Sequence, residues 1–183
     1  MALQIHLTSV PAKRDNGFIE ISTTSNGFIG KLIRYKGEAA HAAAAPHAGV
    51  NALNAAMMGM MGVHAIRETF QEKDYIRFHP IITQGGDLVN VIPSDVRMES
   101  YVRAGNVPAM IDANKRINQA LKAGAMAVGA EAEIKDLPGY LPLQNNDVLN
   151  KFLRQNAEGL IGEDNVWVAP HMTGSTDTGD LSH

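Results

Sequence analysis

The chain has 183 residues, a formal net charge of −3 and 45% hydrophobic residues, a composition ordinary for a globular protein. Its 16 basic residues are scattered along the sequence, so neither nucleic acid nor a membrane is expected as a partner. The absence of cysteine excludes disulfides and thiolate metal sites, and it fits a reducing, cytoplasmic location.

Strand-like and helix-like patterns alternate along the chain. The patterns predict strands at 2–8, 18–23, 28–35, 75–84, 95–103, 131–137 and 166–169, and helices at 50–69, 107–128 and 147–161. Turn-forming pairs at Asn26-Gly27, Gly85-Gly86 and Pro138-Gly139 separate these elements. From residue 28 to residue 137 the order is therefore strand, helix, strand, strand, helix, strand.

This order predicts an α/β (α+β) protein with a ferredoxin-like domain, in which two helices cover one face of a four-stranded antiparallel sheet. We expect this domain to span residues 27–138. Residues 1–26 and 139–183 are too short for a good second core, and we expect them to be fragments of one further domain. Both ends of the chain look cut.

The helix predicted at 50–69 is rich in methionine and glycine. Met57, Met58, Met60 and Met61 favour ordinary core packing, and a subunit interface is the alternative, because methionine and small residues suit adaptable contacts.

Two histidines lie in a small-residue loop before this helix. His41 is either bonded to the local backbone or presented to a ligand. His47 is expected to cap or contact the helix start, and His64 and His79 are expected to be structural. His6 lies in an apolar strand, where a buried, hydrogen-bonded histidine is the more common case.

Asn90 and Arg103 are the other candidates for binding. The Asn90 amide follows a glycine turn and could hold that turn or donate to a substrate oxygen. Arg103 ends a strand, and its fork could bind a carboxylate or simply be solvated. The polar loop at 174–180 lacks the terminal glutamate of an EF-hand calcium site.

Three of these segments together resemble the zinc-dependent amidohydrolase and exopeptidase family. That family includes aminoacylases, carboxypeptidases, and the hippurate, indole-acetyl-amino-acid and aminobenzoyl-glutamate hydrolases. The matching segments are residues 37–53 with His41, Pro46 and Gly49; Gly85-Gly86 with residues 90–93 and Arg103; and residues 174–177.

The resemblance implies a metallopeptidase or amidohydrolase that cleaves N-acyl or aminoacyl amino acids. Its catalytic α/β domain would bind one or two zinc ions, and residues 27–138 would form a lid that makes a homodimer. His41 would stabilise the oxyanion in the partner's active site, and Asn90 and Arg103 would bind the substrate. His6 matches a zinc ligand before the lid, which reverses the interpretation drawn from its strand alone.

The family's other metal ligands and its glutamate base have no counterpart in this sequence. We therefore expect the chain alone to bind zinc weakly and to be inactive. Two rival interpretations are a stand-alone ferredoxin-like binding module and a dimerisation module without a ligand, because this fold supports many functions.

Overall fold

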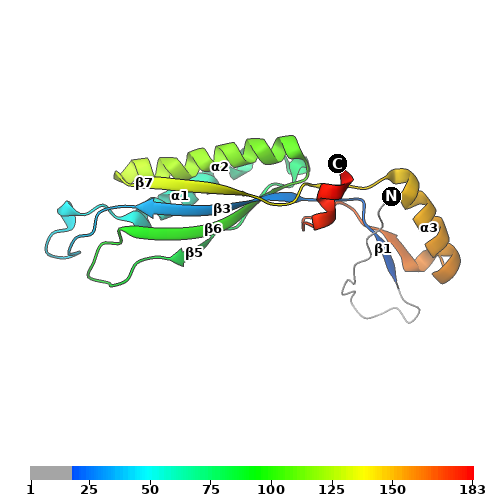
Figure 1. Cartoon of the computed structure of the whole chain (residues 1–183), viewed down its shortest axis with the longest axis horizontal. Coiled ribbons are helices and arrows are strands. Elements are labelled where there is room, and N and C mark those ends of the chain that lie inside the picture. The colour runs from blue at the N-terminus through cyan, green and yellow to red at the C-terminus, as the bar shows by residue number, and fades with distance from the viewer. Residues whose placement is uncertain (1–17) are drawn as a thin grey trace.

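The computed structural model describes residues 18–183, and Figure 1 shows two parts joined along the long axis of the molecule. The predicted strand at 2–8, with His6, lies outside the described residues. The strands are β1 (Ile19–Ile21), β2 (Thr24–Ser25), β3 (Gly27–Lys36), β4 (Arg77–Phe78), β5 (Ile81–Gln84), β6 (Asp95–Ala104), β7 (Glu131–Pro138), β8 (Leu143–Gln144) and β9 (Val166–Val168), and the helices are α1 (Ala52–Ile66), α2 (Val107–Val128) and α3 (Asp147–Ile161).

The larger part is an antiparallel sheet with α1 and α2 on one face (Figure 1). Its strand order is β4-β6-β3-β7, and β5 pairs with the same strand, β6, further along. This arrangement confirms the predicted fold class. The single strand expected at 75–84 is wrong in detail, because it is two strands, β4 and β5. They are separated by His79 and by Pro80, which has no backbone N–H to continue a ladder.

Alternation along β3 and β6 assigns one face of the sheet to the helices and leaves the other open. On the helix side lies an apolar core, whose buried strand residues are Ile33, Tyr35, Val96, Met98 and Val102. The Tyr35 hydroxyl donates to the Leu121 carbonyl of α2 at 3.1 Å, so the phenol is satisfied inside this core.

The two helices pack closely because each contributes a glycine to the contact. A Cβ added at Gly124 of α2 would lie 2.2 Å from the backbone nitrogen of Gly59 in α1. The glycines of α1 thus serve the helix pair, whereas Met57, Met58 and Met61 are 50%, 44% and 64% exposed.

Asn51 caps α1, and its Oδ1 accepts from the backbone nitrogens of Leu53 and Asn54 at 2.9 and 3.0 Å. The expectation that His47 caps this helix is therefore wrong, because His47 lies in a separate 3-10 turn, Pro46–Ala48.

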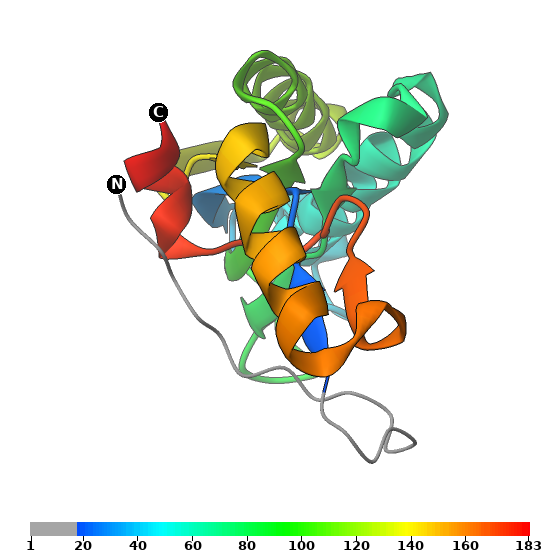
Figure 2. The same ribbon diagram turned by 90° about the vertical axis from the view of Figure 1, so that its right-hand side faces the viewer.

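The smaller part contains the parallel pair β1 and β9, the antiparallel pair β2 and β8, and α3, which lies in front in Figure 2. Asn26-Gly27 does not break the chain as expected, since β2 continues almost directly into β3. Gly27 is needed there for close approach, because a Cβ would lie 2.5 Å from the Tyr140 carbonyl oxygen. No helix among residues 18–183 is long and apolar enough to cross a membrane.

Candidate functional site

The end of the sheet farthest from the smaller part carries two loops that pair with each other. We call this end the tip, and it consists of residues 38–50 and 85–93. His41 forms an isolated antiparallel bridge with Val91, and the Ala42 nitrogen donates to the Asn90 carbonyl at 2.9 Å. Two sequence candidates, His41 and Asn90, therefore lie side by side on exposed backbone.

The backbone of its own loop orients the His41 ring. Nδ1 accepts from the backbone nitrogens of Ala43 and Ala44, at 3.3 and 3.1 Å. A ring nitrogen that accepts carries no proton, so in the neutral ring the proton is on Nε2. Within residues 18–183 Nε2 has no recorded partner, and it can donate to a group outside the chain.

Arg103 lies at the opposite end of β6, where the sheet meets the smaller part. We call this end the hinge. Its Nη1 donates to Ser175 Oγ at 2.6 Å, and its guanidinium carbon lies 5.3 Å from the Phe28 ring centre and 5.4 Å from that of Tyr101. Stacking fixes the plane of the guanidinium and leaves other N–H groups for a carboxylate.

The structure does not bring Asn90 and Arg103 together within one chain. β6 is 10 residues long and lies between them, which corresponds to about 30 Å of strand. Asn90 belongs with His41 at the tip, and Arg103 belongs with the polar loop at 174–177. Their predicted roles toward one substrate therefore need a second copy of the chain.

The hinge also holds a buried polar cluster that sequence reasoning missed. Asn26 is fully buried, and its Nδ2 donates to the carbonyl oxygens of Tyr75 and Thr173 at 3.1 and 3.3 Å. His171 lies 2.9 Å from both Asn26 Oδ1 and Thr24 Oγ1 and stacks on Tyr75. Burial lowers the pKa of His171. The cluster joins the lid to the smaller part, and the Asn-Gly pair that signalled it also signals a turn.

His79 and His64 also have definite places. His79 lies between β4 and β5 rather than in a strand, with its ring edge-on to Tyr101 at 6.0 Å. Burial, with repulsion from Arg103 and Arg67, lowers its pKa. His64 is exposed on α1.

The part of the chain that the structure describes contains no group of three His, Cys, Asp or Glu side chains able to hold a metal ion. His171 is engaged as above, and His183 Nε2 lies 2.8 Å from the Pro142 carbonyl oxygen. His6, the predicted zinc ligand, lies outside the described residues. Residues 18–183 thus do not fit a metal site by themselves.

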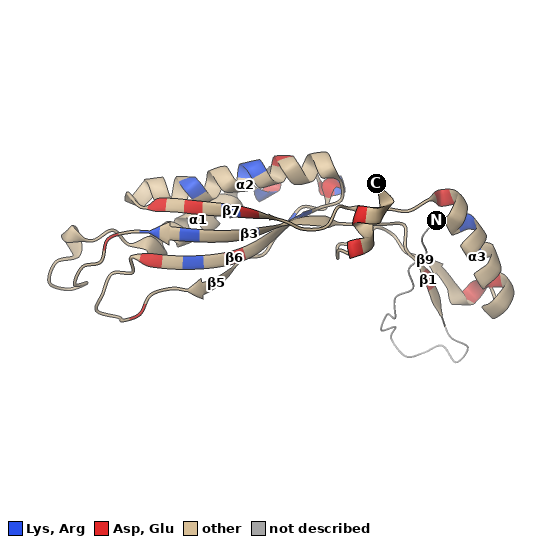
Figure 3. Cartoon of the chain, viewed as in Figure 1, with Lys and Arg blue, Asp and Glu red and all other residues tan. Residues whose placement is uncertain are grey.

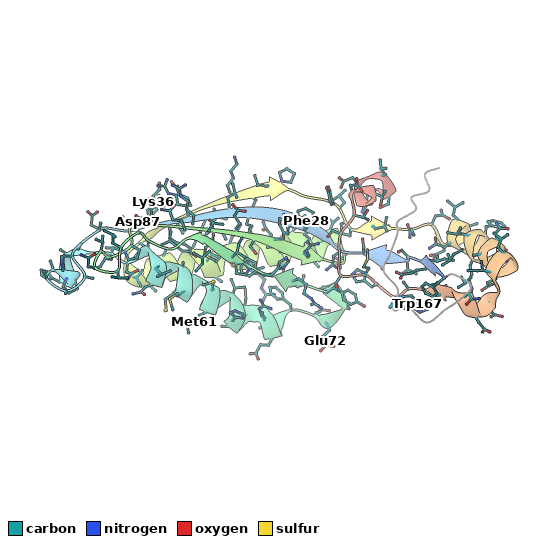
Figure 4. The ribbon with its side chains drawn as sticks, turned by 90° about the horizontal axis from the view of Figure 1, so that it is seen from below. Phe28, Lys36, Met61, Glu72, Asp87 and Trp167 are labelled. Atoms are coloured by element: carbon teal, nitrogen blue, oxygen red, sulfur yellow. The ribbon has the colours of Figure 1, made fainter. Side chains whose placement is uncertain are left out.

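One side of the larger part is uncharged. Neither α1 nor β5 contains Lys, Arg, Asp or Glu, whereas β3, β6 and β7 carry charges along their length (Figure 3). The exposed apolar side chains on this side are Met57, Met58, Met61, Ile81 and Ile82. Arg67, just after α1, donates to the Phe78 carbonyl at 2.8 Å and so holds α1 beside this sheet edge (Figure 4).

Comparisons with known proteins agree with this architecture. Residues 23–128 match the M20 peptidase dimerisation domain. The chain is 34% identical to the Xaa-Arg dipeptidase of Mus musculus over 155 residues, which are 82% of this chain and 35% of that protein. It is also 34% identical over 116 residues to a p-aminobenzoyl-glutamate hydrolase homolog of Haemophilus influenzae, covering 63% of this chain and 27% of that protein.

Solved structures show the same fold. A tripeptidase from Staphylococcus aureus superposes with a TM-score of 0.70 at 20% identity, over 88% of this chain and 42% of that one. An aminobenzoyl-glutamate utilization protein from Klebsiella pneumoniae gives 0.64 at 21% identity, over 87% and 44%. Peptidases of this family generally use divalent metal ions. The chain spans about a third of the length of the curated relatives it matches, and it belongs to the M20 peptidase family, whose dimerisation domain it contains.

Proposed function

We propose that this chain supplies the dimerisation lid of a metal-dependent hydrolase that cleaves the amide bond of N-acyl or aminoacyl amino acids. One observation carries the proposal: the tip with His41 and Asn90 and the hinge with Arg103 lie at opposite ends of one sheet, with an unprotected edge strand between them. Such a molecule forms a complete substrate site when two copies join tip to hinge.

The edge strand β5 supports a defined geometry for this pair. An edge strand without charges invites pairing with another strand, whereas the opposite edge, β7, is protected by Glu131, Glu133 and Lys135. We expect two β5 strands to pair antiparallel about a two-fold axis, with the methionines of α1 covered by the same contact.

This axis would place the tip of one protomer beside the hinge of its partner. Ile82 of β5 pairs with Met98, and Arg103 lies five residues from that level toward the hinge, about 17 Å away. Asn90 lies eight residues from Met98 in the other direction, at most about 27 Å of extended chain. The two-fold brings such regions alongside each other because both lie at comparable distances from the axis.

In the combined site each candidate has a chemical role. Arg103 would bind the substrate carboxylate with its fork, and the Asn90 amide would donate to a neighbouring oxygen. His41 Nε2–H would donate to the scissile carbonyl oxygen as it gains negative charge, an interaction worth about 3 kcal/mol in comparable sites. The family's metal ion would supply Lewis-acid chemistry. Because residues 18–183 do not fit a metal by themselves, we expect this chain alone not to hydrolyse amides.

Sedimentation equilibrium of the purified chain tests the assembly. We expect a dimer, which Met61→Lys or Ile82→Lys converts to a monomer. The control is Met126→Lys, since Met126 is 80% exposed on α2 away from this side. A monomeric parent chain, or equal dissociation by Met126→Lys, would contradict the proposed interface.

Mixing two variants tests the composite site. N-benzoylglycine binding, followed by NMR titration, should disappear in both His41→Ala and Arg103→Ala. An equimolar mixture should regain about a quarter of the sites, because half the dimers are mixed and each has one intact site. A mixture that binds no better than either variant would show that the two residues do not share a site across the dimer.

A further inference from the structure

The open face of the sheet carries a polar strip that leads away from Arg103. On β6 the side chains of Arg103, Tyr101 and Glu99 alternate with buried core residues, so all three lie on the face opposite the helices. Phe28 and Tyr140 extend this strip at the hinge, with the Phe28 ring centre 4.6 Å from that of Tyr101 and 5.2 Å from that of Tyr140.

The two ends of the strip carry opposite charge. Arg77 is directly opposite Arg103 in the sheet register, so the hinge end is positive. Glu99, four residues away, is exposed and flanked in register by Leu32 and Ile81. The strip therefore begins with a cation, continues over an aromatic ring and ends with an anion.

Glu99 differs from the other acids of this face. Asp95 accepts from Arg34 at 2.6 Å and from Arg97 at 2.9 Å, and Glu133 is paired with Lys36. Within residues 18–183 no basic side chain forms a recorded ion pair with Glu99. The nearest base across the sheet is Lys135, two strands away at about 10 Å, with Leu32 between them.

We propose that Glu99 and Tyr101 recognise a basic side chain on the carboxyl-terminal amino acid of the substrate. The inference rests on the proposed function, because it takes Arg103 as the anchor for the substrate carboxylate. With that carboxylate held, the side chain extends over the Tyr101 ring and its cation reaches the Glu99 carboxylate. Tyr101 is 44% exposed, so its ring is accessible for this contact.

Length and charge both favour this occupant. Four residues of β6 correspond to about 14 Å, and the guanidinium of Arg103 folds back over Tyr101, which shortens the remaining gap. A gap of this kind suits a long side chain such as that of arginine rather than a short one. An acidic side chain would meet Glu99 with like charge, and a neutral one would leave that carboxylate without a partner.

The test compares ligands that differ only in charge. N-acetylarginine and its neutral analogue N-acetylcitrulline are titrated into the chain and followed by NMR. We expect N-acetylarginine to bind about tenfold more tightly. Glu99→Gln should bring the ratio close to one without weakening N-acetylcitrulline, and Glu99→Lys should favour N-acetylglutamate. Glu131→Gln, an exposed acid of β7, is the matched control and should retain the preference.

The outcomes separate this inference from the proposed function. If both ligands bind in an Arg103-dependent manner with equal affinity, or if Glu99→Gln retains the preference, the inference is wrong and the proposed function stands. If no N-acetyl-amino acid binds in an Arg103-dependent manner, the proposed function itself is wrong and takes the inference with it.

Discussion

The contact between α1 and α2 predicts that one substitution has opposite effects at two helical glycines. At Gly124 an added Cβ would lie 2.2 Å from the Gly59 nitrogen and 2.6 Å from the Ala55 carbonyl oxygen. Both are backbone atoms, so the helices must separate by more than an ångström to reach an ordinary contact. At Gly159 of α3 nothing lies within 4 Å of the added atom.

The magnitudes follow from these distances. Replacing glycine by alanine inside a helix stabilises it by about 1 kcal/mol. At Gly124 overpacking costs about 1–3 kcal/mol, and separation of the helices also weakens the bond from the Tyr35 hydroxyl to the Leu121 carbonyl, worth about 1 kcal/mol. We expect Gly124→Ala to destabilise the lid by about 2 kcal/mol and Gly159→Ala to stabilise the smaller part by up to about 1 kcal/mol.

Urea unfolding measures both effects. Far-UV circular dichroism follows the helices, and the fluorescence of Trp167, the single tryptophan, follows the smaller part, where it stacks on Phe18. A Gly124→Ala chain whose unfolding midpoint equals or exceeds that of the parent would refute the packing described here.

Two further predictions concern polar groups. Lys31 is buried and pairs with Asp136 at 2.5 Å, so Asp136→Asn should cost about 3 kcal/mol in urea unfolding at pH 7 by leaving a buried, unpaired cation. Burial raises the pKa of the Asp136 carboxyl, but hydrogen bonds from Lys31, Asn114 and Asn118 outweigh it and lower the pKa below its ordinary value. The stabilisation is thus present above about pH 4 and lost as the pH falls through the lowered pKa, and a gap between parent and variant that stays constant down to about pH 2 would contradict this. Asn51→Ala should lower stability by about 1 kcal/mol through loss of the α1 cap, with His47→Ala as a near-neutral control; equal effects would show that Asn51 is not the cap.

Periodicity predicted much of the fold because the pattern there is strong. Helices α2 and α3 coincide with the expected 107–128 and 147–161, and alternation located β6 to within a residue. The split of the strand at 75–84 escaped because Pro80 lies in an otherwise strand-like run. Asn26-Gly27 was misread because burial of the Asn26 amide depends on Tyr75 and Thr173, which are distant in sequence.

The candidate residues were found by type and spacing, but their grouping was not. Asn90 and Arg103 are 13 residues apart in sequence, and only the straight course of β6 shows that they lie at opposite ends of the sheet. The ring orientation of His41 likewise depends on the conformation of its own loop, which no residue pattern specifies.

The bare edge of β5 also has a consequence for the life of the newly made chain. Until a partner covers it, its backbone groups remain open to any other extended segment, and exposed isoleucines beside them increase that hazard. Correct assembly then competes with aggregation in a concentration-dependent manner. Yield on expression and resistance to precipitation should therefore follow the strength of the contact between protomers more closely than the stability of the isolated fold.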